Sequence, residues 1–437
     1  MRIKLEFTGC RLNISEIETL SRQFRLAGHQ IVGPGQPADL CVFNSCTVTH
    51  LADRTSRRRI RRLKRENPQA ALVVTGCYAQ QAPEVMRRLG VDLVVGNEDK
   101  DQLLQKTIEA GLLDASHSVP PPDAPFPLPQ PGGHTRAFVK VQDGCDNRCT
   151  FCIVTVARGG SRSRTIADVV AEVRQLTGLG YQEAVLTGVH LGSFGHDRGD
   201  RRGLQTLVQA ILAQTGIPRL RLSSLEPWDL DEDFFALWQN PRLCRHLHLP
   251  LQSGSDAVLK RMARRTDRAR FATLVQAARR AIPGLGLTTD LMVGFPGETE
   301  AEFADSLAFA DRMAFSKMHI FRFSPRRGTA ACAMPGQVPP AVAHERSRRM
   351  HALSARHERA FRQSMLGQSL PVLWESSQQT PGGRLWSGLT GNYIRVTAFS
   401  ARNRHNRITP ATLTALLPDA VAARIPGEAL PLTAPVS

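Results

Sequence analysis

Three closely spaced cysteines are the residues of this 437-residue chain with the clearest potential for chemistry. Cys145, Cys149 and Cys152 form a C-x3-C-x2-C pattern within DGCDNRCTFCIV. A structural zinc site or a closed iron–sulfur site takes four ligands, and the nearest histidines, His134 and His190, lack the spacing of a zinc finger. Three thiolates can instead hold three irons of a four-iron cluster, which leaves the fourth iron for a reacting molecule.

Three further cysteines each follow a predicted strand. Cys10, Cys46 and Cys77 come after the apolar segments IKLEF, DLCVFN and ALVVT, each directly behind a Gly or a Ser. Helical patterns separate these segments, which predicts a parallel sheet covered by helices, with LVVG at 93–96 as a fourth strand. Because the carboxyl ends of parallel strands share one edge, we expect the three thiols to converge on a metal site. The alternative is that each is simply a small buried residue.

The other cysteines have no partner in the sequence. We interpret Cys41, Cys244 and Cys332 as core residues, the usual place of a free thiol.

A proline-rich segment, VPPPDAPFPLPQPGG at 119–133, is followed by a second alternation of strands and helices. The strand candidates are residues 137–141, 183–187, 219–224, 246–250, 286–294 and 319–324, and the helix candidates are 165–178, 203–214, 230–238, 255–263, 268–281 and 299–313. Six such units predict an incomplete βα barrel, with its chemistry at the carboxyl ends of the strands. The informative residues at those ends are Gly188, Glu226, Gln252, Gly294 and Gly297.

The segment beyond residue 365 has short strand patterns with glycine turns, which predict a small β-barrel. The expected fold class is therefore α/β with this barrel appended. The expected domains are an N-terminal parallel α/β domain at 1–115, a linker at 116–134, the βα barrel at 135–364 and the small barrel at 365–430. Tyr393 and Arg395 give the small barrel aromatic and basic groups suited to nucleic acid.

The charge of the chain indicates a polyanionic partner. The formal net charge is +17 and the pI is about 10.3. Eight basic residues gather in RTSRRRIRRLKR at 54–65, a predicted helix that includes Arg58, Arg61 and Arg62. This pattern favours an RNA-facing helix over the alternative of a plain solvated surface. No segment is apolar enough to span a membrane and the start lacks a signal-peptide pattern, so a cytoplasmic enzyme is expected.

The motifs as a set are similar to those of the methylthiotransferases of the radical S-adenosylmethionine superfamily. The segments that carry this resemblance are GCRLN, NSCTVT, ADRTSR, TGCYAQ, GCDNRCTFCIV, ARGGSRSR, LTGVHLGSFG, SSLEP, HLPLQSGSD, VGFPGET, SPRRGTAA and ERSRRM, over roughly residues 1–400. The sequence departs from the family pattern at Thr155-Val156, where Pro-Tyr is common, and at Ile14-Ser15.

The resemblance implies a radical barrel between an N-terminal methylthiotransferase domain and a C-terminal RNA-binding β-barrel called TRAM. It implies two 4Fe–4S clusters, one held by Cys145, Cys149 and Cys152 and the other by Cys10, Cys46 and Cys77. S-adenosylmethionine would bind the open iron of the first cluster and be cleaved to a 5′-deoxyadenosyl radical. The candidate residues around it are Phe151, Gly188, Glu226, Gln252, Gly294 and Gly297. For Phe151 the alternative is a core aromatic, and for Glu226 and Gln252 it is capping of the backbone.

The implied reaction is 2-methylthiolation of N6-threonylcarbamoyladenosine at position 37 of tRNA, beside the anticodon. Arg158, Arg162 and Arg164 follow the cysteine loop and are candidate contacts to anticodon-loop phosphates, although each could instead pair with a carboxylate. The implied partners are tRNA, a low-potential electron donor such as flavodoxin or ferredoxin, and a sulfur donor. Two alternatives keep the chemistry but act on N6-isopentenyladenosine or on an aspartate of a ribosomal protein. A third is a non-catalytic iron–sulfur protein that binds RNA.

Overall fold

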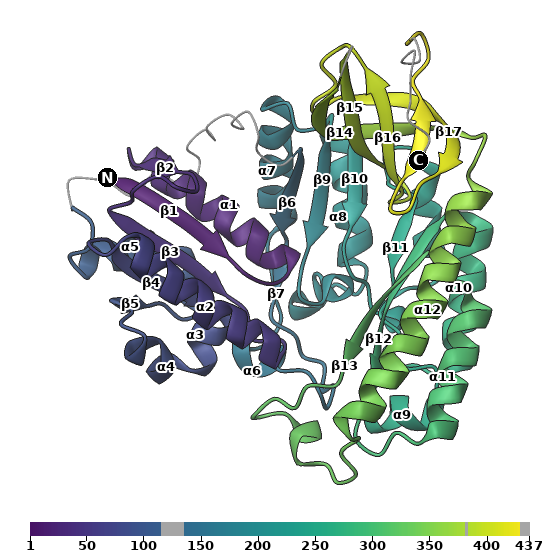
Figure 1. Cartoon of the computed structure of the whole chain (residues 1–437), viewed down its shortest axis with the longest axis horizontal. Coiled ribbons are helices and arrows are strands. Elements are labelled where there is room, and N and C mark those ends of the chain that lie inside the picture. Colours follow the sequence, from purple (N-terminus) through teal and green to yellow (C-terminus); the bar gives the residue numbers. More distant parts are fainter. Residues whose placement is uncertain (115–134, 381–382, 429–437) are drawn as a thin grey trace.

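The computed structural model describes residues 1–114, 135–380 and 383–428 (Figure 1). The whole predicted linker at 116–134 and the end of the chain lie outside the described residues. Two parallel sheets lie side by side, and a closed barrel lies against one end of the second (Figure 1).

The N-terminal sheet has five parallel strands in the order β2-β1-β3-β4-β5. They are β1 (Arg2–Phe7), β2 (Gln30–Val32), β3 (Leu40–Ser45), β4 (Ala71–Gly76) and β5 (Leu93–Val94). The helices are α1 (Arg11–Leu26), α2 (His50–Glu66), α3 (Cys77–Gln81), α4 (Pro83–Arg88), η1 (Lys100–Gln102) and α5 (Leu103–Glu109). The four predicted strands are confirmed, and the short edge strand β2 was not predicted.

Strand β3 shows why this sheet is covered on both faces. All six of its residues are buried. Leu40 and Val42 pack with side chains of α1 and α5, while Cys41 and Phe43 pack with those of α2 and α4. Successive side chains of a strand point to opposite faces, so a continuous apolar run needs a helical layer on each side.

The central sheet consists of six parallel strands, as predicted. They are β6 (Arg136–Lys140), β9 (Glu183–Thr187), β10 (Arg219–Leu222), β11 (His246–His248), β12 (Gly286–Val293) and β13 (Lys317–Arg322). The pairings run β6-β9-β10 and β11-β12-β13, and parallel bridges at Leu220–Leu243 and Ser224–His248 join the two halves. The result is an open, incomplete barrel, and α1 of the N-terminal unit packs beside its edge strand β6.

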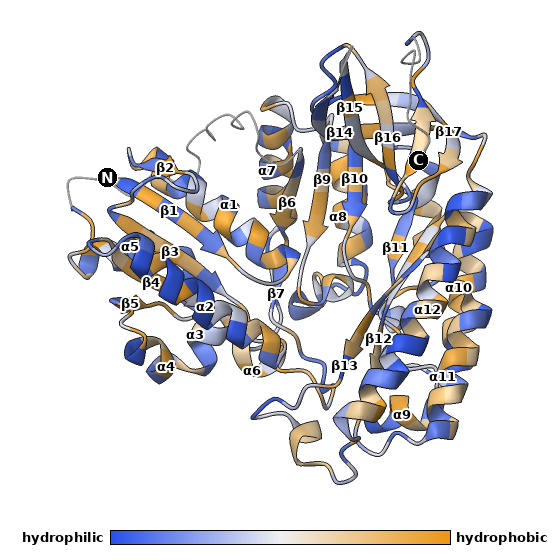
Figure 2. Cartoon of the chain, in the orientation of Figure 1, coloured by the Kyte–Doolittle hydropathy of each residue, from blue (hydrophilic) through white to orange (hydrophobic). Residues whose placement is uncertain are grey.

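Helices cover the outside of the central sheet, and their inner faces are mainly hydrophobic (Figure 2). They are α7 (Ile166–Gly178), α8 (Gly203–Gln214), α9 (Asp256–Arg261), α10 (Arg268–Ala281), α11 (Glu300–Met313) and α12 (Pro340–Ser364). Residues 230–238 were predicted as an α-helix, but the turn there is the 3-10 helix η5 (Asp233–Gln239). The 25-residue α12 was not predicted, because its many charged residues leave only a narrow apolar stripe.

The C-terminal segment closes into a barrel of five strands in the order β14-β15-β16-β18-β17. They are β14 (Ser369–Thr380), β15 (Gly383–Thr390), β16 (Arg395–Ser400), β17 (Ile408–Leu416) and β18 (Val421–Arg424). Trp374 and Trp386 are buried at its centre. Closure leaves no unpaired sheet edge, which suits a small barrel beside a larger domain.

A buried charge cluster holds this barrel against the amino ends of the central strands. Glu183, at the start of β9, pairs with Arg221 at 2.6 Å and with Arg219 at 2.8 Å. The two guanidiniums donate onward to backbone carbonyls of the C-terminal barrel, of Leu389, Thr390 and Gly391. Glu183 is fully buried, so its charge is needed to balance the two arginines.

Replacing Glu183 with glutamine is expected to destabilise this junction by about 3–5 kcal/mol, because two buried cations lose their counter-charge. Burial alone would raise the pKa of Glu183, but Arg219 and Arg221 outweigh it and lower the pKa to about 2. The stabilisation is therefore present at neutral pH and is lost as pH falls from about 4.5 towards 2. Thermal unfolding with limited proteolysis measures the effect. Glu84→Gln, in an exposed pair with Arg87, is the control, and an equal effect of both variants would contradict the prediction.

Candidate functional site

The first cysteine set lies in a loop behind the short strand β7 (Gln142–Asp143). Gly144 has φ +69°, and a Cβ at that position would lie 1.9 Å from the carbonyl oxygen of Gly160. The backbone N–H of Cys145 donates to the carbonyl of Gly159 at 3.0 Å, and that of Cys152 donates to the carbonyl of Cys149 at 3.1 Å. The loop is therefore folded back tightly on itself, which brings the three thiols to one place.

Polar side chains from other segments of the barrel surround this set. Cys145 Sγ lies 3.9 Å from Nδ1 of His190, whose other ring nitrogen contacts Asp229. Cys149 Sγ lies 3.9 Å from Nη1 of Arg264. Burial, with smaller contributions from the neighbouring Cys149 and Cys145, raises the pKa of Cys152 to about 12. Binding of a metal cluster by these thiols must therefore release protons.

The second cysteine set lies at the carboxyl edge of the N-terminal sheet. Cys10 precedes α1, Cys46 follows β3, and Cys77 is the first residue of α3. A Cβ at Gly9 would lie 2.8 Å from Cys46 Sγ, so the segment before Cys10 packs directly on Cys46. Burial raises the pKa of Cys46 to about 12, with a further contribution from Cys10 and Cys77. The three thiols are thus neighbours, as the strand ends indicated, and their role as ligands stays a prediction.

The donor sets fit clusters of several irons. Each set offers three thiols, and His190, the histidine beside Cys145, has its other ring nitrogen on Asp229. In the part of the chain that the structure describes, no group of three His, Cys, Asp or Glu side chains is arranged to bind a single metal ion. A four-iron cluster holds its thiolates at separate corners, farther apart than the ligands of one ion, and thiolates are its normal ligands.

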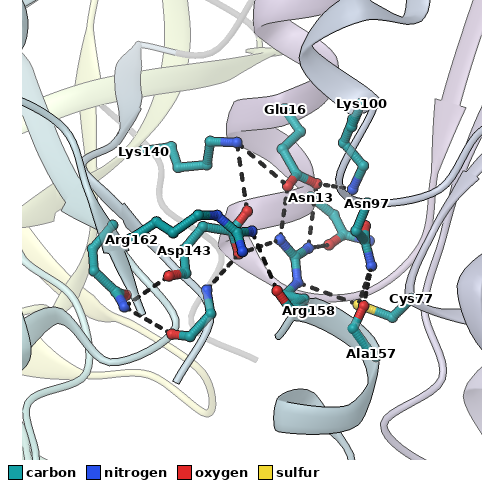
Figure 3. A network of polar contacts seen from close by, with 12 residues as sticks. Asn13, Glu16, Cys77, Asn97, Lys100, Lys140, Asp143, Ala157, Arg158 and Arg162 are labelled. Atoms are coloured by element: carbon teal, nitrogen blue, oxygen red, sulfur yellow. Dashed lines mark hydrogen bonds and ion pairs between the residues drawn. The ribbon is translucent and has the colours of Figure 1, made fainter. Parts of the chain in front are cut away.

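Arg158 lies between Cys77 of the second set and Asp143, two residues before Cys145 of the first, and corrects one expectation (Figure 3). It was predicted to contact RNA phosphates, but only 3% of its surface is exposed. Its guanidinium binds Cys77 and two carboxylates inside the protein. The alternative of pairing within the protein is therefore correct for Arg158.

The predicted S-adenosylmethionine residues lie at the carboxyl ends of β9 to β12. Gly188 packs on Gln142, where a Cβ would lie 2.9 Å from Oε1. Both terminal nitrogens of Arg264 donate hydrogen bonds to the carboxylate of Glu226. Gln252 has φ +73°, a strained conformation for a residue other than glycine. Such strain is frequent where a backbone must be held ready for a ligand.

Three other candidates of this group have packing roles in the structure. Gly294 has φ +74°, and its missing Cβ makes room for Ala343 of α12. Gly297 has φ +72° and lies beside Arg261. Phe151 packs against a small apolar cluster that contains Met262. Their contacts with S-adenosylmethionine stay predictions.

The predicted RNA-binding residues differ in exposure. Arg58, Arg61 and Arg162 are exposed, and among the described residues no carboxylate pairs with them. Arg62 is half exposed and pairs with Glu6 at 2.7 Å. Arg164 pairs with Glu172 at 2.5 Å, so its charge is already partly neutralised.

In the C-terminal barrel, Arg395 is exposed and pairs with Glu375 at 2.8 Å. Tyr393 corrects a second expectation. Its ring stacks on His246 with centroids 4.8 Å apart, and its hydroxyl accepts a hydrogen bond from Arg11 at 3.0 Å. Tyr393 therefore fills the junction of the three units, with the Arg221 guanidinium also 4.6 Å from its ring centroid.

The structure also adds residues that had no assigned role. Arg326, from the SPRRGTAA motif, is buried and binds Thr47 and Asp53 beside Cys46. Arg264 and His190 contact the first cysteine set, and the composition offered no signal for them because their partners are distant in sequence. Of the three cysteines interpreted as core residues, Cys41 and Cys244 are buried, but Cys332 is exposed, so that expectation was wrong. Cys332 belongs to the short 3-10 turn η6 (Ala330–Ala333) on the surface.

Comparisons with known proteins show to which family this chain belongs. A family model described as the radical SAM superfamily matches residues 139–310, and one described as uncharacterized protein family UPF0004 matches residues 2–96. The threonylcarbamoyladenosine tRNA methylthiotransferase MtaB of Bacillus subtilis is 38% identical over 397 residues, which are 89% of this chain and 88% of that protein. The chain belongs to the radical S-adenosylmethionine methylthiotransferase family.

Other relatives agree with this assignment. The protein of the same name from Thermotoga maritima is 37% identical over 85% of this chain and 86% of its own length. A tRNA-2-methylthio-N(6)-dimethylallyladenosine synthase of Parafrankia sp. is 37% identical over 86% of this chain and 79% of its own length. The solved structure of the radical S-adenosylmethionine methyltransferase TsrM from Kitasatospora setae has a TM-score of 0.56 at 16% identity, covers 76% of this chain and 77% of its own, and supports the fold alone.

Among the residues that the structure describes, every helix is too short or too polar to cross a bilayer.

Proposed function

We propose that this methylthiotransferase acts on tRNA and attaches a methylthio group to C2 of N6-threonylcarbamoyladenosine at position 37. The observation that carries the proposal is the pair of three-thiol sets held at two facing strand edges, in a chain that is 38% identical to the Bacillus subtilis MtaB protein over almost its whole length. A C–H bond of the adenine ring offers no acidic proton, so radical chemistry is needed and ordinary acid–base catalysis is insufficient.

Two 4Fe–4S clusters and S-adenosylmethionine are the cofactors. Cys145, Cys149 and Cys152 would hold one cluster, and Cys10, Cys46 and Cys77 the other. When bound, these cofactors supply the 5′-deoxyadenosyl radical, the sulfur and the methyl group that the reaction requires. Three protein thiolates for each cluster leave one corner of each without a protein ligand, which is what a reactive cluster needs.

The chain's own residues position and shield this chemistry. Arg264 holds the Glu226 carboxylate with two charge-assisted bonds of 3.0 and 2.6 Å, which fixes its orientation at the strand end. The buried carboxylate of Glu298 accepts a hydrogen bond from the backbone N–H of Gly294 at 2.7 Å and pairs with Arg346. These contacts hold the turn after β12 rigid, so the backbone there is preorganised for a ligand.

The exposed arginines of α2 are the proposed contact to the anticodon stem-loop. Arg54, Arg58, Arg61 and Arg65 are all exposed, and their spacing places them on one face of the helix. Arg162 adds an exposed cation behind the first cysteine set. The target base must leave its stack to reach the strand ends, which costs a few kcal/mol, and phosphate contacts of this kind supply the compensating affinity.

A double variant, Arg58→Ala with Arg61→Ala, is expected to weaken binding of an anticodon stem-loop and to flatten its salt dependence. Each lost phosphate contact removes roughly 0.7–0.9 from the slope of log K against log salt, so the slope should fall by about 1.5. Arg270→Ala with Arg280→Ala, exposed residues of α10, removes the same charge elsewhere and is the control. Equal slopes for the two double variants would contradict the proposed interface.

Analysis of the modified nucleosides in the host's tRNA identifies the substrate. Deletion of the gene should remove the 2-methylthio group from threonylcarbamoyladenosine, as measured by nucleoside mass spectrometry, and re-expression should restore it. Loss of the 2-methylthio group from N6-isopentenyladenosine instead would favour the second candidate function. The 37% identity to the Parafrankia synthase is the observation that supports this alternative. The other two alternatives, a ribosomal protein substrate and a non-catalytic regulator, have no such support.

The remaining partners are proposals from the chemistry. Cleavage of S-adenosylmethionine needs one electron, so a low-potential donor such as flavodoxin or ferredoxin is required. Each turnover consumes a sulfur atom, so a sulfur donor is required as well. We infer that the enzyme works in the cytoplasm, where its tRNA substrate is found.

A further inference from the structure

Arg158 is the charged residue that connects the two thiol sets, and radical chemistry alone does not account for it. It ends the short helix α6 (Val154–Arg158), six residues beyond Cys152, yet its side chain reaches into the N-terminal unit. Its surface is 3% exposed. Burial of a guanidinium is costly unless every donor is used, so its partners define its role.

All three nitrogens of the guanidinium have partners (Figure 3). Nε donates to Cys77 Sγ at 3.2 Å. Nη1 donates to Glu16 at 2.8 Å and to Asp143 at 2.9 Å. Nη2 donates to Oδ1 of Asn13 at 3.2 Å. The planar fork thus binds a thiol of the second set, and it also binds Asp143, which stands two residues before Cys145 of the first set.

The partners of Arg158 are themselves fixed. Glu16 also pairs with Lys100 at 2.8 Å, and both side chains are almost fully buried. Burial would raise the pKa of Glu16, but Lys100 and Arg158 outweigh it and hold the pKa well below its ordinary value, so the carboxylate is charged. Asn13 accepts a weak bond from Cys10 Sγ at 3.5 Å. The network therefore reaches two of the three thiols of the second set.

We propose that Arg158 is a positioning residue that fixes the Cys77 thiolate relative to the first cysteine set and raises the reduction potential of the cluster on Cys10, Cys46 and Cys77. This proposal rests on the proposed function only in requiring that these cysteines hold a cluster. Hydrogen bonds to ligand sulfurs are one of the main determinants of cluster potential. A cationic donor at 3.2 Å stabilises the more negative, reduced cluster, and so its removal should lower the potential.

A second buried arginine provides a matched comparison. Arg264 is related to the first set much as Arg158 is to the second. It pairs with Glu226 through both terminal nitrogens, and Nη1 lies 3.9 Å from Cys149 Sγ. Each thiol set thus has one buried guanidinium at one of its sulfurs, so the two arginines should affect different clusters.

The test uses the full-length chain with each cluster measured separately. A background with Cys145, Cys149 and Cys152 changed to alanine retains only the second set. Arg158→Gln, Arg158→Lys and Arg264→Gln are introduced into it, and each protein is reconstituted with iron and sulfide without oxygen. Iron per chain is measured, and the midpoint potential is followed by electron paramagnetic resonance.

Arg158→Gln is expected to lower the reduced-to-oxidised ratio of this cluster roughly tenfold at a fixed potential, which is about 59 mV for a one-electron couple. Arg158→Lys keeps the positive charge but loses the planar set of donors, so its potential should lie between those of the unsubstituted chain and Arg158→Gln. Arg264→Gln should leave the potential unchanged. In the reciprocal background, with Cys10, Cys46 and Cys77 changed to alanine, only Arg264→Gln should shift it.

The possible results separate the two proposals. A background protein that holds no iron on Cys10, Cys46 and Cys77 would overturn the proposed function and this inference together. Normal iron content with an unchanged potential in Arg158→Gln would overturn only the inference, since a merely structural ion pair leaves the potential where it was. If Arg158→Gln fails to fold, Arg158→Lys alone must show an altered potential, and an unaltered one would overturn the inference.

Discussion

Replacing Cys77 with alanine is expected to abolish methylthiolation of tRNA while 5′-deoxyadenosine is still formed. Cys77 belongs to the second thiol set, and the first set, at the carboxyl ends of the central strands, remains intact. Loss of even an outer-shell partner of a metal typically costs 10–100-fold, so loss of a ligand should reduce product formation by at least about 100-fold. Mass spectrometry of tRNA nucleosides and chromatography of 5′-deoxyadenosine measure the two activities in one reaction.

Two further variants complete this experiment. Cys152→Ala removes a thiol of the first set and should abolish both products, because the radical is formed there. Cys41→Ala removes a buried thiol that lies within β3 and belongs to neither set, and both activities should persist. Loss of 5′-deoxyadenosine in Cys77→Ala at normal iron content in the first set would show that the two sets do not have the separate roles proposed here.

Replacing Gly76 with alanine is expected to have the second large effect, on stability and on cluster content together. Gly76 has φ +97°, and a Cβ there would lie 2.3 Å from the Ser45 carbonyl oxygen and 2.4 Å from Oδ1 of Asn44. With ψ −178° this conformation is one that essentially only glycine adopts; it costs a residue with a Cβ about 1–3 kcal/mol, and overpacking adds about 1–3 kcal/mol. The backbone that carries Cys46 and Cys77 must move apart, so iron bound by the second set should fall.

Gly35→Ala is the matched control for this variant. Gly35 has φ +77°, but no atom lies within 4 Å of the position of a Cβ, so the substitution meets the backbone strain without the clash. Thermal unfolding of the metal-free chain and iron per chain should be affected much more by Gly76→Ala than by Gly35→Ala. Equal behaviour of the two variants would mean that the close approach of β3 and β4 at this edge does not matter for the thiols.

The parallel strands are the part of the fold most accurately predicted from the sequence. Strands such as β3 and β9 are fully buried and have short apolar centres, so their limits agree with the structure to within a residue or two. Segments held mainly by distant contacts were missed. The edge strand β2 has only three residues, and α12 is largely polar and depends on packing against β13 and α11.

The cysteines illustrate the same limit within the candidate site. The spacing of Cys145, Cys149 and Cys152 is local, so the sequence indicates the set directly. Cys10, Cys46 and Cys77 are far apart along the chain, but the rule that parallel strands end at one edge was enough to bring them together. Cys332 was misplaced because neither spacing nor hydropathy tells a surface turn from a buried one.

The sequence by itself determined the two cysteine triplets, the parallel strands of the two sheets except β2, the family and the excess of positive charge. Only the tertiary structure decided what each arginine does. Arg158 pairs with Glu16, 142 positions away, Arg62 with Glu6, 56 positions away, and only residues such as Arg58 remain exposed. The physical reason is that a guanidinium has a long, flexible stem and five donors, so its place is fixed by whichever distant carboxylates, carbonyls or thiols the fold brings within its reach.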